Sequence, residues 1–288
     1  ALVVIAGDPA LLRIQVEDID YLGSRKLEAV AAQAVEAEES GFDTVLVMDH
    51  FYQLPMLGAP DNAMIECYTL LAALSQRTSR VRLSALVTGN TYRHPSLLAK
   101  TVTALDVVSG GRAQLGIGAG WFELEHDSLG FEFGTFTDRF EKLEEALRIV
   151  IPMLRGERPS LEGTWYSVHE AINSPAPVGR IPVMIGGGGE KKTLRMVAQY
   201  ADESNIICAP DEIPRKLAVL DAAVAAIPEL AARAGGVILG SPDEVRPIYE
   251  RSLASGVDGV TVNLPANGHV PGRVALLGET LAPVVNRS

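Results

Sequence analysis

Short apolar runs rich in β-branched residues alternate along the chain with longer stretches in which apolar residues recur at helical spacing. This alternation predicts βα units and a parallel sheet. The predicted strands are residues 13–17, 44–48, 81–87, 113–118, 183–186, 203–208 and 259–263. One further strand is expected between 208 and 259, where "GGVILGS" is the only candidate. Either this run is the seventh strand or the sequence lacks residues in that region.

Three of the intervening stretches predict helices that end at a glycine. Residues 25–40, 97–108 and 139–154 have helical apolar spacing, and Gly41, Gly110 and Gly156 follow them. Glycine terminates helices readily because it adopts the left-handed conformation without a steric penalty. The repeated order of strand, helix and glycine supports a parallel sheet.

The length of 288 residues fits one α/β barrel. We therefore expect an α/β fold, a (βα)8 TIM barrel, in a single domain over residues 1–288. The segment 121–180 is longer than an ordinary βα connection, so it predicts an insertion after strand 4 that lies over one face of the barrel.

Composition narrows the class of partner. The chain is 47% hydrophobic and 21% charged, as in soluble enzymes, and its net charge is −11. An acidic protein repels a phosphate backbone, which argues against a nucleic-acid partner, and an anionic cofactor would need local donors. No apolar run reaches the roughly 18 residues of a membrane span.

The two cysteines, Cys67 and Cys208, are far apart and lack metal-ligand spacing. They favour neither a disulfide framework nor a zinc site, and a reducing cytoplasm is the expected compartment. The apolar start "ALVVIAG" is short and has no preceding basic stretch, so it is a poor signal peptide.

Polar residues follow the predicted strands where apolar ones would suit a core. Asp49 and His50 follow the second strand, and "TGNTYRHP" follows the third. In a parallel barrel the carboxyl ends of the strands meet at one mouth, where such residues face the site. The alternatives are a turn cap for Asp49 and a hydrogen-bonded buried imidazole for His50.

Four glycines, Gly186, Gly187, Gly188 and Gly189, stand between the fifth predicted strand and an amphipathic helix. Backbone N–H groups in such a loop and at a helix N-terminus bind phosphate, although a glycine hinge without a ligand remains open. The run "GIGAG" ends at Trp121 where a dinucleotide motif needs a third glycine, so it is weak evidence for NAD. Gly118 and Gly120 could instead let a flat group approach the backbone, with Trp121 as a wall or as ordinary core.

The chain resembles the luciferase-like monooxygenase superfamily, and within it the deazaflavin-dependent (coenzyme F-420) oxidoreductases. The matching stretches are "AEESGFDTVLVMDHF", "LSALVTGNTYRHPSLLAKTVTALDVVSGGRAQLGIGAGW", "RFEKLEEALRIVIPMLRG" and "IPVMIGGGGEKKTLRMVAQYAD". They cover most of the chain from about Glu36 to Asp202, in the order found in the family.

The resemblance implies a protein that binds coenzyme F-420 at the mouth of the barrel and acts on a small-molecule substrate. We also expect it to be a cytoplasmic homodimer. It implies that Asp49 and His50 lie close to the reactive ring and that His50 donates or accepts the proton. It places a bulge, often with a non-proline cis peptide, near Ala85, Leu86 and Thr88, against the back of the ring. The cofactor-binding glycines would be Gly118, Gly120, Gly186, Gly187, Gly188 and Gly189.

Two features depart from the family pattern. Related sugar-phosphate dehydrogenases have a glutamate that acts as an acid where this chain has Trp121. This difference argues against sugar-phosphate oxidation. Glu123 and Glu125 are close by in sequence, but their directions are open. About a dozen residues also precede the expected first strand. The rival functions are an FMN-dependent monooxygenase on the same barrel and a non-catalytic protein that binds flavin or deazaflavin.

Overall fold

The computed structural model describes residues 3–6, 11–15, 26–206, 208, 212–225, 246–247, 250, 259–263 and 272–285. The strands are β1 Val3–Ala6, β2 Leu11–Gln15, β3 Thr44–Val47, β4 Arg82–Ala85, β5 Thr88–Gly89, β6 Ala113–Gly118, β7 Leu161–Glu162, β8 Ser167–Val168, β9 Val183–Gly186, β10 Glu203–Ile206 and β11 Gly259–Asn263. The helices are α1 Lys26–Glu39, α2 Cys67–Ser75, α3 Pro95–Ser109, α4 Glu123–Leu129, α5 Phe136–Leu154, α6 Thr193–Tyr200, α7 Ile213–Ala225 and α9 Arg273–Val285.

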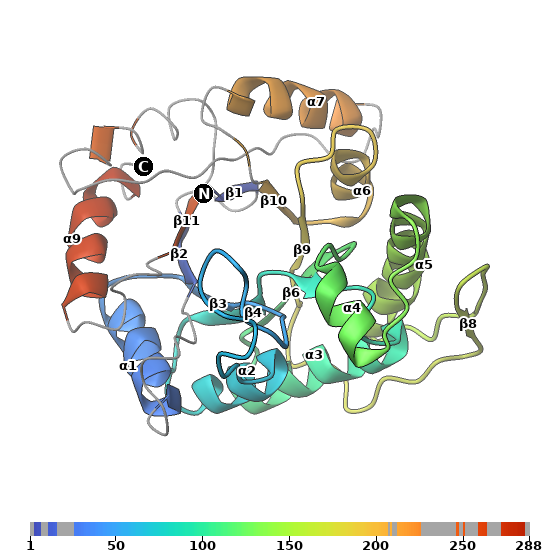
Figure 1. Cartoon of the computed structure of the whole chain (residues 1–288), viewed down its shortest axis with the longest axis horizontal. Helices are drawn as coiled ribbons and strands as arrows, with labels where there is room; N and C mark the ends of the chain where they lie inside the picture. The colour runs from blue at the N-terminus through green and yellow to red at the C-terminus, as the bar shows by residue number, and fades with distance from the viewer. Residues whose placement is uncertain are drawn as a thin grey trace.

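The main sheet is curled and almost wholly parallel. Its strand order is β4-β3-β2-β11-β1-β10-β9-β6-β5, and β4 also pairs with β6, which lies near the other end of that order. Figure 1 shows the helices arranged outside the curled sheet. This confirms the α/β class with a parallel sheet. The candidate strand "GGVILGS" lies outside the described residues.

The strand β1 was not predicted. It pairs antiparallel with both β10 and β11, whereas the other pairings in the main sheet are parallel. In the sequence this apolar stretch was assessed only as a signal peptide. A single short apolar run has no periodicity that would distinguish a strand from other apolar segments.

Local signals explain where the predicted helices begin and end. Pro95 opens α3, and Gly110 ends it with φ +70°. Thr135 and Asp138 form a reciprocal capping box at the start of α5, with Asp138 Oδ2 accepting from Thr135 N at 2.7 Å. Gly41 follows α1 with φ +84°, as its predicted C-terminal position requires.

The segment 121–180 holds α4, α5 and the small antiparallel pair β7–β8. The longer of its two helices, α5, packs beside α3 on the outside of the sheet. It is therefore the ordinary helix of a βα unit, and only α4 and the β7–β8 hairpin are additional to that unit.

The core lies on both faces of the sheet. The larger cluster fills the space between the strands and the outer helices, with Leu83, Leu115 and Leu147 fully buried. A second cluster joins Leu46 of β3 to Met184 of β9. These strands are not neighbours in the sheet, so the contact must cross its concave face.

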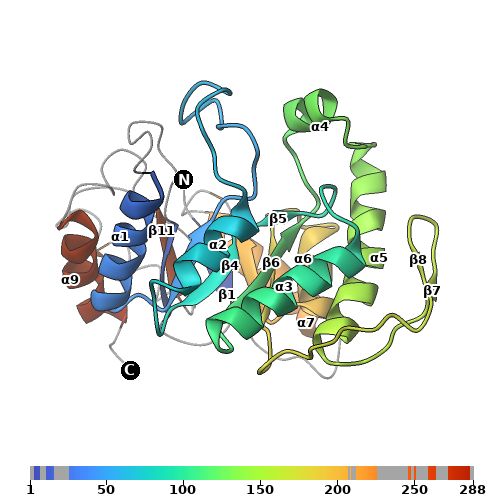
Figure 2. The same ribbon diagram turned by 90° about the horizontal axis from the view of Figure 1, so that it is seen from below.

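The two ends of the sheet differ. We call the end where β3, β5, β6 and β9 finish the mouth, and the opposite end the base. Figure 2 shows α4 and the loop from β3 to α2 rising together on one side of the sheet. No helix in the described ranges is long and apolar enough to cross a membrane.

Candidate active site

The mouth brings the predicted site residues together. Gly89 pairs with Gly118, Ile117 with Ile185, and Asn205 with Gly186, so the ends of β5, β6, β9 and β10 align. Asp49 joins them because its Oδ2 accepts from Gly89 N at 3.2 Å. The predicted convergence of Asp49, Thr88, Gly118 and the glycine run at one end of the sheet is therefore confirmed.

The predicted interruption of the third parallel strand is also present. The strand β4 stops at Ala85, β5 begins at Thr88, and the peptide bond between Leu86 and Val87 is cis. The Val87 side chain then lies against two glycines: a Cβ at Gly118 would stand 2.9 Å from Val87 Cγ2, and one at Gly186 would stand 2.7 Å from it. Both glycines thus make room for a neighbouring side chain of the protein itself.

Ala85 and Thr88 are fully buried. The Ala85 side chain belongs to the core, and Thr88 Oγ1 lies 2.5 Å from the hydroxyl of Tyr68. A cofactor contact from these two residues would therefore come from the backbone. Leu86 is only partly buried and packs against the cluster on the concave face.

The remaining predicted glycines lie in two loops. Gly120 has φ +81°, and a Cβ there would meet Thr91 Oγ1 at 2.7 Å. Gly187 has φ +126° and donates its N–H to Asn205 O at 2.7 Å. Gly188 accepts from Lys216 Nζ at 2.8 Å, and Gly189 is exposed just before α6. The glycine run thus forms a turn between β9 and α6 with a lysine beside it.

Asp49 is the centre of a buried ion network and is 2% exposed. Its two carboxylate oxygens accept from Arg93 Nη1 at 2.6 Å and Nη2 at 2.9 Å. Arg93 Nη2 also reaches Glu66 Oε1 at 2.6 Å, and its guanidinium lies over the Tyr68 ring. The network ties the end of β3 to the start of α2 and to the loop before α3.

Burial and the ion pairs act in opposite directions on the pKa values of this network. Burial raises the pKa of Asp49 above its ordinary value, and the charge of Arg93 opposes that rise. For Arg93, burial disfavours the charge, but the Asp49 carboxylate outweighs burial and raises the pKa. Both groups therefore depend on each other to remain in place without water.

His50 is held from the other side of the mouth. Its Nδ1 lies 2.9 Å from Glu125 Oε2, and its side chain is 11% exposed. Its ring makes edge contacts with Trp121 and Phe122, each at a centroid separation of 5.6 Å. In the described part of the chain no group hydrogen-bonds to Nε2 of His50. Among the described residues, only Nδ1 of this imidazole is therefore engaged.

Glu125 answers a question that the sequence left open. It is fully buried on α4, whereas Glu123 is exposed. Burial raises the pKa of Glu125, but hydrogen bonds from His50, Tyr92 and the N–H of Tyr52 outweigh burial, and the net shift is downward. The spacing of Phe122, Glu125 and His126, at i, i+3 and i+4, places them on one helical face and could have indicated this burial.

Tyr92 completes the surroundings of Glu125. Its hydroxyl donates a short hydrogen bond to Glu125 Oε2. Burial raises the pKa of Tyr92, and the nearby carboxylate raises it further, so the phenol keeps its proton and acts as a donor. Its ring stacks on His126, which is also fully buried.

Aromatic and apolar side chains form the walls near His50. Trp121 is 56% exposed and stacks on Phe122, which is buried with Met48 and Leu54. Trp121 is thus a surface wall at the mouth, not core. Within the described ranges, no cluster of three or more histidine, cysteine or acidic side chains is arranged for a metal ion.

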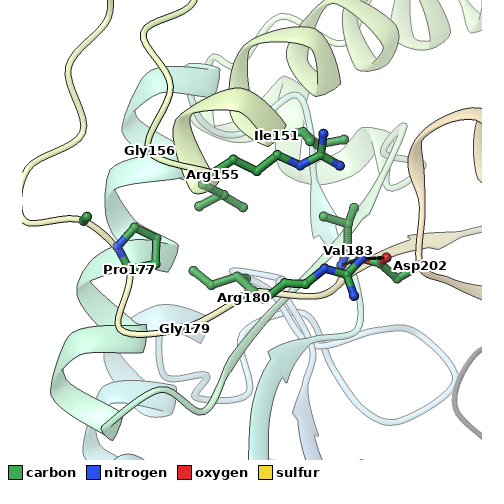
Figure 3. A pocket seen from close by; sticks show the side chains of 11 residues that line it. Ile151, Arg155, Gly156, Pro177, Gly179, Arg180, Val183 and Asp202 are labelled. Carbon is green, nitrogen blue, oxygen red and sulfur yellow. Dashed lines mark hydrogen bonds and ion pairs between the residues drawn. The ribbon is translucent and has the colours of Figure 1, made fainter.

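A cavity of about 330 Å³ lies at the base, away from these residues. Figure 3 shows Arg155 and Arg180 beside it, with Arg180 paired to Asp202. Its lining includes Val183, the first residue of β9, so it opens at the amino ends of the strands. The chemistry-bearing residues are at the carboxyl ends, and the candidate site is therefore the mouth.

Comparison with known proteins gives a family match and partial relatives. The family model described as luciferase-like monooxygenase matches residues 11–253. A protein of Microbacterium testaceum named F420-dependent glucose-6-phosphate dehydrogenase is 37% identical over 172 residues, covering 58% of this chain and 49% of that protein. A protein of the same name from Kineococcus radiotolerans is 34% identical over 158 residues, covering 54% and 45%. The chain therefore matches about half the length of these relatives.

Two solved structures share the fold. An F420-dependent secondary alcohol dehydrogenase, in complex with an F420-acetone adduct, superposes with a TM-score of 0.80 at 16% identity, over 96% of this chain and 99% of that chain. The coenzyme F420-dependent tetrahydromethanopterin reductase of Methanopyrus kandleri gives 0.74 at 16% identity, over 96% and 99%. At these identities the likeness concerns the fold alone.

Proposed function

Since this chain belongs to the luciferase-like monooxygenase family, we propose that it is an oxidoreductase that moves a hydride between coenzyme F-420 and a small organic substrate. The observation that carries this proposal is the imidazole of His50 at the mouth, beside Trp121, whose Nε2 has no hydrogen-bond partner among the described residues. The names of the partial relatives support the choice of a deazaflavin.

The residues at the mouth fit such a cofactor. Asn205 is buried at the end of β10, and in the described part of the chain its Nδ2 has no hydrogen-bond partner. A ring carbonyl would satisfy that donor, whose burial without a partner is costly. The turn at Gly187 and Gly188 precedes the N-terminus of α6, and Lys216 lies beside it. This combination suits the phosphate of the cofactor.

A bound deazaflavin would supply a two-electron hydride acceptor or donor that does not readily activate oxygen. The protein would supply the proton transfer. In the direction of alcohol oxidation, Nε2 of His50 would take the hydroxyl proton, and a bound deazaflavin would be the acceptor for the hydride of the carbinol carbon. The substrate would thereby become a carbonyl compound, and in the reverse direction His50 would return the proton.

The other mouth residues would then hold and shape the site. Asp49 has both oxygens occupied by Arg93, so its proposed role is to position the end of β3 and not to react. Gly118, Gly120 and Gly186 have no side chains, which leaves space for Val87 and Thr91. We propose that the same lack of side chains lets a flat ring approach the backbone at these positions.

The substrate is proposed to be a small organic molecule other than a sugar phosphate. By the family resemblance, Trp121 stands where sugar-phosphate dehydrogenases place a glutamate that acts as an acid. Its exposed ring, with Phe122, offers an apolar surface close to His50. Such walls favour an uncharged organic substrate.

The finer architecture is also proposed here: one (βα)8 barrel domain over residues 1–288, with additions after strand 4. The pairing of β4 with β6 and the helices outside the sheet support it. A homodimer and a reducing cytoplasm both stay predictions from the sequence.

Titration of the apoprotein with coenzyme F-420 and with FMN tests the cofactor. Deazaflavin absorbs at shorter wavelength than FMN, so absorbance separates the two complexes. We expect tight binding of F-420 and turnover with members of an alcohol and ketone panel. Tighter FMN binding with oxygen consumption would favour the monooxygenase instead, and binding without turnover would favour a non-catalytic protein.

Gly188→Asp tests the phosphate position. Gly188 has no positive φ, so a side chain there does not strain the backbone. A carboxylate beside a bound phosphate should weaken F-420 binding about 10²-fold or more, through repulsion and steric clash. The matched control is Gly179→Asp, at an exposed base position where a new Cβ meets nothing within 4 Å. Equal affinity in both variants would rule out a phosphate at this turn.

A further inference from the structure

We propose that Glu125 is a positioning residue that fixes the tautomer of His50, so that Nδ1 carries the proton and Nε2 is the proton acceptor. This role extends the proposed function, because it makes the imidazole ready to take a proton from an alcohol. The sequence alone assigns no role to Glu125.

The carboxylate of Glu125 is fully oriented by donors. Its Oε1 accepts from the backbone N–H groups of Phe51 at 2.5 Å and Tyr52 at 2.8 Å. Its Oε2 accepts from Tyr92 and lies 2.9 Å from Nδ1 of His50. With a fully buried side chain and both oxygens engaged, Glu125 has no room to turn away from the imidazole.

The chemistry of these donors determines which group carries the proton. The two backbone N–H groups can only donate, and the Tyr92 hydroxyl donates to Oε2, so an ionised carboxylate satisfies all three donors. The lowered pKa of Glu125 agrees with that state. An ionised carboxylate has no proton to give to Nδ1. Nδ1 must therefore donate, and the neutral imidazole of His50 then has its lone pair on Nε2.

The aromatic neighbours keep the ring in that orientation. Trp121 and Phe122 contact the imidazole edge-on, with interplanar angles of 74° and 76°. Phe122 precedes α4, which carries Glu125, so one short segment both packs the ring and binds its Nδ1. When Nε2 takes a proton, the buried carboxylate also stabilises the resulting imidazolium.

A purely structural role for Glu125 is the competing explanation, because the same carboxylate ties the loop at 51–52 to α4. Glu125→Gln separates the two roles. The N–H groups of Phe51 and Tyr52 require an acceptor, so the amide oxygen of glutamine should occupy the Oε1 position. The amide NH₂ then faces Nδ1 of His50, which must become the acceptor. The neutral tautomer is thereby reversed, and Nε2 carries the proton.

The first test is nitrogen NMR of the histidine side chains, with the His50 signal assigned from its loss in His50→Ala. In the wild-type apoprotein we expect a protonated Nδ1 and an unprotonated Nε2 in the neutral ring. In Glu125→Gln we expect the opposite pattern. A wild-type protein with the proton on Nε2 would overturn the inference, whether or not the variant folds.

The second test is turnover. We expect Glu125→Gln to lower kcat about 10²- to 10⁴-fold, the range for loss of a correctly oriented general base, with a small change in KM and melting temperature. Tyr92→Phe is the matched control, since it removes a donor from the same oxygen without contacting Nδ1. It should keep the wild-type tautomer and lose far less turnover.

These readouts separate failure of the inference from failure of the proposed function. A reversed tautomer in Glu125→Gln, in a protein without F-420 turnover, would support the positioning and refute the proposed function. Wild-type turnover that survives unchanged in Glu125→Gln, or falls equally in Tyr92→Phe, would overturn the positioning while leaving the proposed function in place.

Discussion

Buried and partly buried charges lie at both the base and the mouth of the sheet, but their partners differ. At the base, Glu38 accepts from the backbone N–H groups of Ser79, Arg80 and Val81. Arg112 there donates to the backbone oxygens of Ser75, Thr78, Ser109 and Val81.

At the mouth the partners are charged or titratable side chains. Arg93 binds both Asp49 and Glu66, and Glu125 binds His50 and Tyr92.

This difference in partners suggests that the base network stabilises the fold and that the mouth network takes part in the reaction. The partners at the base are backbone groups and the hydroxyls of Ser79 and Thr78, none of which titrates near neutral pH. The base network therefore only holds the loop between α2 and β4 in place. Side-chain partners can change protonation and orientation when a ligand binds. We therefore expect substitutions at the base to change stability alone and substitutions at the mouth to divide between stability and turnover.

The largest expected effect is on catalysis at the mouth. His50→Ala should slow turnover about 10²- to 10⁴-fold, equivalent to about 3–5 kcal/mol in the barrier. Its melting temperature should change little, because Glu125 keeps its other donors. Steady-state kinetics with F-420 beside thermal unfolding is the measurement. Unchanged turnover would make His50 a structural residue.

The second effect is on stability at the mouth. Arg93→Ala leaves the Asp49 carboxylate buried without its cation, which should cost about 3–5 kcal/mol of unfolding free energy. Arg77→Ala is the control: Arg77 pairs with Glu28 on the surface, and an exposed pair contributes about 1 kcal/mol or less. Equal losses in the two variants by denaturant unfolding would show that burial of the Asp49 pair does not matter.

The third effect is at the base and depends on pH. Burial opposes ionisation of Glu38, but its backbone hydrogen bonds lower the pKa from 4.5 to about 2. A carboxyl with a lowered folded-state pKa stabilises the protein above the unfolded pKa, and that stability is lost as pH falls towards 2. The shift corresponds to about 3 kcal/mol.

Glu38→Gln isolates this contribution. At pH 6 it should be about 3 kcal/mol less stable than wild type, and the gap should close by pH 2. Glu28→Gln, at an exposed side chain, should show no such gap. Unfolding by denaturant across this pH range is the measurement, and turnover at pH 7 should be the same in all three proteins. A constant gap would mean that hydrogen bonds other than those to the charged form are responsible.

The regular elements were predictable because their signals are local. The predicted strands 113–118, 183–186 and 259–263 match β6, β9 and β11, and helix 25–40 matches α1 within one residue at each end. Strand 81–87 was predicted too long, since the parallel strand stops at Ala85. The helix α2 was not identified, and its capping residue Glu66 was therefore missed.

The site was predictable only in part. His50, Asp49 and the glycines were found because they follow strands, and a strand end is visible in sequence. Their partners were not found. Arg93 meets Asp49 across the β3 and β5 ends, and Glu125 reaches His50 from a helix that follows another strand. Nothing in local spacing specifies such pairs, because they depend on how the strands align at the mouth.

The contact of Val87 with Gly118 and Gly186 also has an evolutionary consequence. Val87, between β4 and β5, shares one small volume with Gly118 at the end of β6 and Gly186 at the end of β9. The effect of a substitution at any of the three therefore depends on the other two. An alanine at 118 is costly beside valine but becomes tolerable once residue 87 is smaller. Across relatives these three positions should vary together. Replacing one of them by the residue of a relative should disrupt the fold more often than replacing all three at once.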